Sequence, residues 1–238
     1  MFPLMSLIFR FCSCSELLPS SQIQPAPVSF KDRLDAAAQL AQALIAYRGK
    51  KPLVLAIPRG GVPMGKFIAE QLQGDFDVVL VRKLGAPYSP EAAIGAVDES
   101  GFTYIAPHAQ AAGADAHYIA SQKAEQMDII RHRRAQYSPV RPPIDRSGRT
   151  VIVVDDGLAT GATMTAALHA VKQNGAEKVV CAVPVAAPES LALVAEIADE
   201  VICLQLPAYF QSVGEHYAFF PQVEDAEVIE LLAAKTTS

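Results

Sequence analysis

Tryptophan is absent from this sequence of 238 residues, and aromatic residues together make up only 7% of it. Charged residues are also scarce at 19%, whereas hydrophobic residues reach 51%. Intrinsically disordered chains have the opposite balance, so this composition excludes that class. The core must be built mainly from Ala, Val, Leu and Ile, and an α/β chain of this length often folds as one domain.

The chain also has no excess of basic residues, and its formal net charge is -5. Proteins that bind nucleic acid broadly carry a basic surface, so we expect no nucleic-acid partner. No apolar run approaches the ~18 residues that span a bilayer, so we expect no membrane association and a cytoplasmic location. An anionic ligand must therefore be held by a local site, against the charge of the whole chain.

Cysteine is used sparingly, with four residues in the chain. Cys181 and Cys203 lie inside apolar runs, while Cys12 and Cys14 lie near the start. None has the paired spacing of a zinc site or a disulfide framework. We expect reduced thiols that act as small hydrophobic residues.

The first 28 residues lack a regular pattern. They are apolar up to Phe11, but Arg10 interrupts the run and no basic segment precedes it, so a secretory signal is only weakly indicated. The Ser-rich, acid-poor composition indicates a transit peptide equally weakly. We expect residues 1–28 to be a disordered N-terminal extension, or the product of a start codon chosen too far upstream. Residues 29–238 then form the folded domain.

The rest of the chain alternates between short apolar runs and helical patterns. Buried strands are predicted at 52–57, 77–81, 150–156, 178–185 and 200–206, and helices are predicted between them. Strands that are apolar throughout indicate a parallel sheet covered by helices on both faces. Between the second and third runs, the pattern predicts a hairpin over 92–106 and a polar helix from about 115 to 136, with its basic run Arg131–Arg134 exposed.

The strongest chemical signal follows the third strand. Val151–Val154 deliver Asp155 and Asp156 to the carboxyl end of a buried strand, which is where open α/β sheets bind ligands. A loop of Gly and Thr over 157–163 then opens a helix, where backbone N–H groups cradle phosphate. Two carboxylates beside it suit a sugar diol and Mg²⁺.

Acids or phosphate loops at a strand end also occur in three rival classes of structure. A Walker A loop is excluded because no Gly-Lys-Ser/Thr follows. A response-regulator acidic pair usually ends the first strand of its domain, whereas Asp155 and Asp156 lie in the middle of the chain. An ordinary strand-turn-helix corner with solvated acids stays open on residue type alone.

Two further loops carry anion-binding chemistry. In the segment 58–65, paired glycines allow close approach of backbone amides to an anion, and Arg59 adds a bidentate donor. Arg82 and Lys83 follow the second predicted strand.

With these residues in place, the sequence VVDDGLATGAT resembles the signature for 5-phosphoribosyl-1-pyrophosphate (PRPP) in type I phosphoribosyltransferases, in a variant similar to adenine phosphoribosyltransferases. The resemblance implies the fold of that family: a central parallel sheet flanked by helices, with a flexible hairpin loop and a small hood. It implies that Asp155 and Asp156 hold the ribose hydroxyls and influence Mg²⁺. The ribose 5-phosphate would be held by Ala159, Thr160, Gly161, Ala162 and Thr163.

The Arg-Gly-Gly loop is similar to the pyrophosphate loop of xanthine and guanine phosphoribosyltransferases. This resemblance implies pyrophosphate contacts from Arg59, Gly60 and Gly61, and an unusual cis peptide that we expect at Arg59-Gly60. The pair Arg82 and Lys83 resembles one that adenine phosphoribosyltransferases place near pyrophosphate, which implies pyrophosphate contacts from both. Arg59 and Lys83 would act with the two aspartates in catalysis. The hairpin 92–106 would be the flexible catalytic loop, in which Glu91, Asp98 or Glu99 could act as acid, base or metal ligand.

The whole ordered chain resembles a group of bacterial phosphoribosyltransferases of unassigned acceptor, which share FKDR, PRGGV, VRKLG, EAAIGA, VDDGLATG and VGEHYAFF as they stand here. The resemblance implies a Mg²⁺-dependent pentosyltransferase that moves phosphoribosyl from PRPP to a nitrogen acceptor, releases pyrophosphate and forms a homodimer. We expect acceptor contacts from Phe210 and Tyr217.

One departure affects the choice of acceptor. Hypoxanthine-guanine enzymes carry an Asp where Ala159 stands, which argues against that substrate, and the long segment before the third strand suggests an enlarged hood. The acceptor is therefore expected to differ from a small free purine. A non-catalytic regulator that binds PRPP or nucleotides, and a salvage enzyme for adenine or a related base, remain as alternatives.

Overall fold

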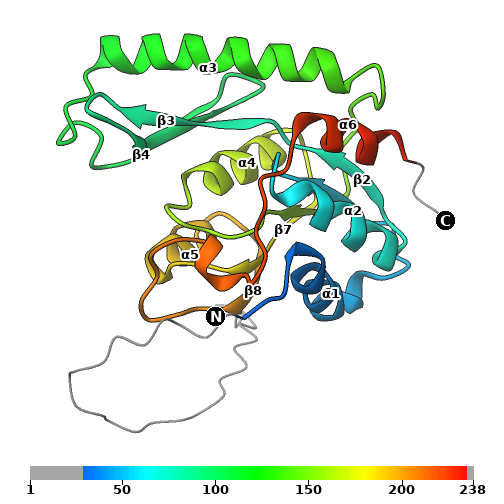
Figure 1. Ribbon diagram of the computed structural model, residues 1–238. Helices are drawn as coiled ribbons and strands as arrows, with labels where there is room; N and C mark the ends of the chain where they lie inside the picture. Colours follow the sequence, from blue (N-terminus) through cyan, green and yellow to red (C-terminus); the bar gives the residue numbers. More distant parts are fainter. Residues whose placement is uncertain (1–28, 235–238) are drawn as a thin grey trace, which may run out of the picture.

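The computed structural model describes residues 29–234, and at positions 90 and 91 it describes the backbone alone. The expectation for residues 1–28 lies outside the described residues. The domain predicted from residue 29 onward is built around two sheets (Figure 1).

The larger sheet has five parallel strands, and its existence confirms the prediction from the apolar runs. The strand order is β2-β1-β6-β7-β8. The strands are β1 (Leu53–Ala56), β2 (Asp75–Val78), β6 (Thr150–Val154), β7 (Lys178–Val185) and β8 (Glu200–Gln205). Because β1 and β6 are neighbours, the loops that follow them meet at one edge of the sheet.

Helices cover both faces of this sheet. On one face, Ile152 and Val154 of β6 share a buried cluster with the helices α1 (Arg33–Ala43), α2 (Gly61–Leu72) and α6 (Asp225–Ala233). On the other face, Val151 and Val153 pack with α4 (Ala162–Gln173) and α5 (Pro188–Ala195). Because successive side chains of a strand point to opposite faces of the sheet, each strand contributes to two hydrophobic layers, one on each face.

A second, antiparallel sheet extends from the first. Its strands β3 (Val81–Ala86), β4 (Ser89–Asp98) and β5 (Thr103–Ile105) are followed by the long helix α3 (Ala116–Tyr137). We call residues 81–137 the flap; its sheet lies between α3 and α4 (Figure 1). The predicted hairpin corresponds to β4 and β5. The long segment thus forms a flap and does not enlarge the hood.

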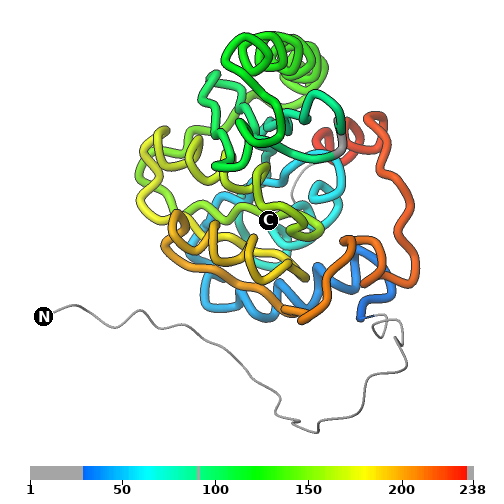
Figure 2. Tube along the Cα trace, turned by 90° about the vertical axis from the view of Figure 1, so that its left-hand side faces the viewer, coloured from blue at the N-terminus to red at the C-terminus, as the bar shows by residue number. Residues whose placement is uncertain are grey.

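The hood is small and joins the two ends of the domain. We use the name for residues 29–33 together with 206–224. Phe30 pairs with Tyr217 in an isolated parallel bridge, and the amides of Ser29 and Phe30 both donate to the carbonyl of His216. In Figure 2 this end of the molecule lies opposite the flap. None of the helices within residues 29–234 is both long and apolar enough to cross a membrane.

Candidate functional site

Two carboxylates end strand β6 at the carboxyl edge of the sheet. The amide of Asp156 donates to Asp155 Oδ1 at 2.9 Å. Burial raises the pKa of Asp155 well above its usual value, and the charge of Asp156 adds to this effect. Burial also raises the pKa of Asp156, although Arg33 acts in the opposite direction. The pair is therefore a concentrated acidic centre that is partly shielded from water.

Arg33 binds this acidic centre from the start of α1. Its Nε and Nη2 donate to Asp156 Oδ2 at 3.0 and 2.9 Å. Nη1 donates to the carbonyl of Pro221 at 2.6 Å, and the guanidinium lies 3.7 Å from the centroid of the Phe220 ring. Sequence patterns indicate no role for Arg33 beyond its place in the FKDR segment. The structure places Arg33 inside the site, where it contacts both the hood and the pair Asp155 and Asp156, which we call the diacid.

The Arg-Gly-Gly loop after β1 packs directly on the diacid. A Cβ atom added at Gly60 would lie 1.9 Å from Asp156 Oδ2, and one added at Gly61 would lie 2.7 Å from the carbonyl oxygen of Val154. A larger residue at either position would force a neighbouring group to move, namely the Asp156 carboxylate at Gly60 and the end of β6 at Gly61. The cis peptide bond is Pro58-Arg59, one residue earlier than expected.

The loop over 159–163 opens helix α4. Gly161 has φ +74° and occupies the N-cap position, where it has no side chain to bond the first N–H groups of the helix. The Thr160 hydroxyl accepts a long bond of 3.5 Å from the amide of Ala162. The Ser190 hydroxyl donates to the carbonyl of Ala159 at 2.6 Å and anchors the loop to α5. Ala159 and Thr160 are exposed. The helix N-terminus can therefore receive an anion from solvent.

A cavity of about 340 Å³ connects the Arg-Gly-Gly loop, the diacid and the hood. It is lined by Arg33, Arg59, Gly60, Asp156, Phe220, Pro221, Gln222 and Val223. The structure thus brings together two of the segments that the sequence predicted to act together. The lining holds two guanidinium groups against one carboxylate, which favours an anionic or electron-rich ligand.

Arg59 lies between this cavity and helix α6. Its Nη1 is 3.5 Å from Glu224 Oε2 and 3.5 Å from Asp225 Oδ2. The Tyr137 hydroxyl donates to Asp225 Oδ1 at 3.0 Å, and burial together with this bond raises the pKa of Tyr137 to about 12. Figure 1 shows α6 beside α2 and near the end of α3.

The Arg-Lys pair lies within β3 and does not follow β2 as the sequence suggested. The Nε of Arg82 donates to Gln126 Oε1 of α3 at 2.9 Å, and Arg82 is partly buried. Lys83 is exposed. Since consecutive strand residues point to opposite faces, only one of the pair faces α3.

The basic run of α3 is divided between solvent and the interior. Arg131 and His132 are exposed, as predicted. Arg134 forms an ion pair with Glu99 at 2.6 Å, and Arg133 Nε lies 3.8 Å from Asp225 Oδ1. The prediction of an exposed run was therefore wrong for its second half.

The acids of the predicted catalytic hairpin have structural partners. Asp98 Oδ1 accepts bonds from the amides of Ser100 and Phe102 and closes the turn between β4 and β5. Glu99 pairs with Arg134 and Arg146. The side chain of Glu91 lies outside the described residues.

The two predicted acceptor contacts both lie in the hood. Tyr217 is only 5% exposed, its hydroxyl donates to the carbonyl of Asp156 at 2.7 Å, and its ring stacks on Phe220. Phe210 stacks on His216 at a centroid distance of 5.5 Å. Neither residue lines the cavity beside Asp156. Tyr217 therefore fixes the backbone of Asp156 through its hydroxyl and does not face the cavity.

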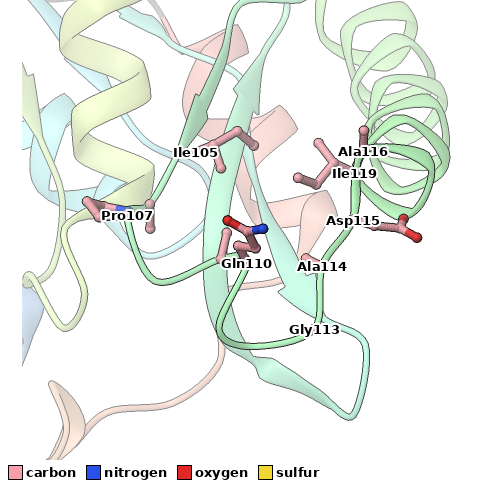
Figure 3. A pocket seen from close by; sticks show the side chains of 10 residues that line it. Ile105, Pro107, Gln110, Gly113, Ala114, Asp115, Ala116 and Ile119 are labelled. Atoms are coloured by element: carbon pink, nitrogen blue, oxygen red, sulfur yellow. The ribbon is translucent and has the colours of Figure 1, made fainter.

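A larger cavity, of about 470 Å³, lies in the flap and contains none of the predicted site residues (Figure 3). Its lining includes Ile105, Pro107, Gln110 and Ile119, from β5, the following loop and the start of α3. It is mostly apolar, and the charged residue in its lining is the acidic Asp115, so it lacks the basic groups expected around a phosphorylated ligand.

The residues present fit a magnesium ion that a substrate shares. No group of three or more His, Cys, Asp or Glu residues within the described part of the chain could hold a metal by itself. Asp155 and Asp156 form a pair, and Mg²⁺ typically takes one or two carboxylates and completes its shell with substrate oxygens and water. The donor set therefore suits a metal that arrives with a phosphorylated substrate.

Comparison with known proteins agrees with this arrangement. The phosphoribosyl transferase domain model matches residues 20–219. The chain is 42% identical over 209 residues to the Mycobacterium tuberculosis (strain H37Rv) protein named "Putative phosphoribosyl transferase Rv0571c", a match that covers 85% of this chain and 46% of that protein. It is 34% identical over 87 residues to a uracil phosphoribosyltransferase of Streptomyces avermitilis, covering 36% of this chain and 41% of that enzyme. The chain spans less than half the length of these relatives.

A solved structure shares the fold. The crystal structure of TT1426 from Thermus thermophilus superposes with a TM-score of 0.74 at 46% identity, covering 86% of this chain and 98% of that one. The segment that matches the family model contains both the Arg-Gly-Gly loop and the diacid. The chain belongs to the phosphoribosyltransferase family and has its α/β fold.

Proposed function

We propose that this protein is a Mg²⁺-dependent phosphoribosyltransferase that transfers the 5-phosphoribosyl group of PRPP to a nitrogen acceptor and releases pyrophosphate. The observation that carries the proposal is the contact between Gly60 and Asp156. A Cβ at Gly60 would lie 1.9 Å from the carboxylate, so the loop proposed for pyrophosphate and the acids proposed for ribose share one site. In PRPP the pyrophosphate is attached to C1 of the ribose, and the 2-hydroxyl is on the neighbouring carbon atom.

The ribose 5-phosphate would bind at the start of α4. Residues 159–163 offer backbone N–H groups and the hydroxyls of Thr160 and Thr163 at a helix N-terminus. The adjacent carboxylates of Asp155 and Asp156 would accept hydrogen bonds from the ribose 2- and 3-hydroxyls. They would also stabilise the positive charge that develops on the sugar as the bond to pyrophosphate breaks.

The leaving pyrophosphate would be held by Arg59, by the amide of Gly60 and by Arg82. Gly61 would contribute by allowing the backbone to approach closely, since its own amide donates to the carbonyl of Ile57. Lys83, the neighbour of Arg82 on β3, would also contact the pyrophosphate. When bound, Mg²⁺ held by Asp155, Asp156 and substrate oxygens would offset the negative charge of the pyrophosphate. Because these donors are fixed before the reaction, their main contribution is positioning and electrostatic stabilisation.

The acceptor would enter between the diacid and residues 220–223, where the cavity opens. Phe210 and Tyr217 remain candidates for acceptor contact, although the structure packs Tyr217 behind Asp156. The family resemblance also suggests a homodimer, which light scattering on the purified chain would test.

The proposal is tested by measuring pyrophosphate release from PRPP and Mg²⁺ with purified protein. The acceptor panel should include uracil, adenine, other bases, amines and aromatic acids. Release that depends on one acceptor supports a transferase. The double variant Asp155→Asn/Asp156→Asn should remove both Mg²⁺-dependent PRPP binding and release while the protein stays folded.

The alternative, a PRPP- or nucleotide-responsive regulator, predicts a different result. PRPP would bind in calorimetry, yet no acceptor of the panel would trigger release. Unchanged PRPP affinity in the double aspartate variant would overturn the assignment of the site itself.

A further inference from the structure

Three arginines from separate segments converge near one carboxylate of helix α6. Arg59 follows β1, Arg82 belongs to β3, and Arg133 belongs to α3. Arg59 Nη1 lies 3.5 Å from Asp225 Oδ2, and Arg133 Nε lies 3.8 Å from Asp225 Oδ1. We call Arg59, Arg82 and Arg133 the three-arginine cluster.

The third member, Arg82, is held by α3. Its Nε donates to Gln126, and the pKa of Arg82 is lowered by burial and by the positive charges of Arg133 and Arg59. Like charges this close repel one another, so the cluster is stabilised by whichever anion lies within it.

The resident anions satisfy the cluster incompletely. Charge-assisted N–H···O bonds are usually about 2.7–2.9 Å long, whereas the contacts of Arg59 and Arg133 with Asp225 measure 3.5 and 3.8 Å. The second acid, Glu224, also reaches Arg59 only at 3.5 Å and is largely exposed. Arg59 and Arg133 thus face two loosely bound carboxylates.

The face of α3 that carries Arg133 packs against the interior of the protein. Gln126, Ile130, Arg133 and Tyr137 are spaced by four, three and four residues, which places them on one stripe of a helix. Ile130 and Tyr137 are buried, and Gln126 is 8% exposed. Arg133 is therefore held within this stripe, one turn before Tyr137, and lies beside Asp225, to which the Tyr137 hydroxyl also donates.

The cluster is continuous with the proposed reaction centre. Arg59 lines the cavity that also contains Gly60 and Asp156, while its guanidinium reaches Asp225. An anion that extends from the ribose site past Arg59 would meet Arg133 and Arg82 next. A diphosphate carries more charge and more acceptor oxygens than one carboxylate, and planar guanidinium groups match such oxygens well.

We infer that Arg133 completes a diphosphate site with Arg59 and Arg82, and that Asp225 is a resident anion which the pyrophosphate group of PRPP displaces. This inference rests on the proposed function, to which it adds a residue of the flap helix and a competing carboxylate of α6. Binding of the diphosphate would release the first turn of α6 from the loop after β1.

The first test is isothermal titration calorimetry with inorganic pyrophosphate and, separately, with PRPP, each with Mg²⁺. Arg133→Ala should weaken both by about tenfold or more, as expected for the loss of a charged hydrogen-bond donor. Arg133→Lys should give an intermediate loss, because it keeps the charge and loses the planar fork. Arg131→Ala is the matched control on the same helix, since Arg131 is exposed and pairs with Asp128, and it should bind both ligands as the native chain does.

The second test changes the carboxylate. Asp225→Asn keeps an oxygen for Tyr137 and removes the charge, so it should tighten pyrophosphate binding several-fold. Glu227→Gln, an exposed acid in the same first turn, is the control and should leave affinity unchanged. Weaker or unchanged pyrophosphate binding in Asp225→Asn overturns the role of Asp225.

Ribose 5-phosphate separates failure of this inference from failure of the proposed function. It should bind the loop 159–163 with equal affinity in the native chain and in Arg133→Ala, which also shows that the variant is folded. If PRPP binds and Arg133→Ala matches Arg131→Ala, the inference is overturned and the proposed function stands. If the native chain binds neither PRPP nor ribose 5-phosphate, both are overturned.

Discussion

Arg33 donates two hydrogen bonds to a single oxygen of Asp156, although the two residues lie 123 positions apart in the chain. The same guanidinium bonds to the hood through Pro221 and lies on the ring of Phe220. One side chain therefore fixes the position of an acid in the proposed reaction centre and the position of the hood above it.

Replacing Arg33 by Gln should lower the free energy of unfolding by about 3 kcal/mol, because it leaves a largely buried carboxylate without its cation. Urea denaturation of the native and variant proteins measures the change. Lys31→Gln is the control, since Lys31 is exposed and lies two residues away.

A double-mutant cycle separates the ion pair from simple packing. Adding Asp156→Asn to Arg33→Gln should recover part of the lost stability, because the neutral amide no longer needs a cation. If the two losses are additive, Arg33 acts on Phe220 and Pro221 alone and the importance of the ion pair is refuted.

Gly60→Ala should disturb the site through one contact. The new Cβ would meet Asp156 Oδ2 at 1.9 Å, so the carboxylate or the loop must move. We expect a loss of about 1–3 kcal/mol in the free energy of unfolding, typical of overpacking, together with weaker PRPP binding.

The matched background for this change is Asp156→Ala, which lacks the clashing carboxylate. In that background Gly60→Ala should have almost no further effect on stability. A full loss in both backgrounds would show that the backbone of Gly60 matters and that its distance from Asp156 does not.

Much of the main sheet could be predicted from the sequence, because apolar strands buried on both faces leave continuous hydrophobic runs. The five runs correspond to β1, β2, β6, β7 and β8, and the run before Asp155 places the diacid at the correct edge. The second run is misleading at its end. Residues on both sides of the break at Val79 and Leu80 are apolar and buried, so periodicity could not show that β2 ends and β3 begins.

The remaining parts of the site depend on contacts between distant residues. The ion pair of Arg33 with Asp156 leaves no local pattern, since neither residue's neighbours indicate the partner. The inward face of α3 is hidden for another reason: Gln126 and Arg133 occupy half of its buried stripe. A helix whose interior positions are polar shows little hydrophobic periodicity, so its basic run resembles an exposed one.

Asp77 provides a pH test of a buried acid outside the site. It is 1% exposed, and its two oxygens accept bonds from the amides of Val78 and Ile144. Burial raises its pKa above the ordinary 3.8. The native state then holds the proton more tightly than the unfolded chain, so this group's contribution to stability is lost as pH rises from 3.8 to the native pKa.

The comparison is between the native chain and Asp77→Asn, by urea denaturation from about pH 3 to pH 7. The native chain should lose stability relative to the variant as pH rises, and the difference should level off above the native pKa. Asp145→Asn is the contrasting control. Bonds from the amide and hydroxyl of Ser147 lower the pKa of Asp145, so its stabilising effect should be lost as pH falls. The same slope in both comparisons would contradict the assignment for Asp77.

Ser190 should support phosphate binding without touching the ligand. Its hydroxyl bonds to the carbonyl of Ala159, and its backbone and Cβ lie 3.3 Å from where a Cβ of Gly161 would be, so it contacts the loop 159–163 at two points. Ser190→Ala should cost about 1 kcal/mol of stability and weaken the binding of ribose 5-phosphate, measured by calorimetry. Glu189→Ala, at the exposed neighbouring position, should leave that affinity unchanged. If Ser190→Ala lowers stability and keeps the affinity, the loop is held by the backbone of Gly161 and the hydroxyl only stabilises α5.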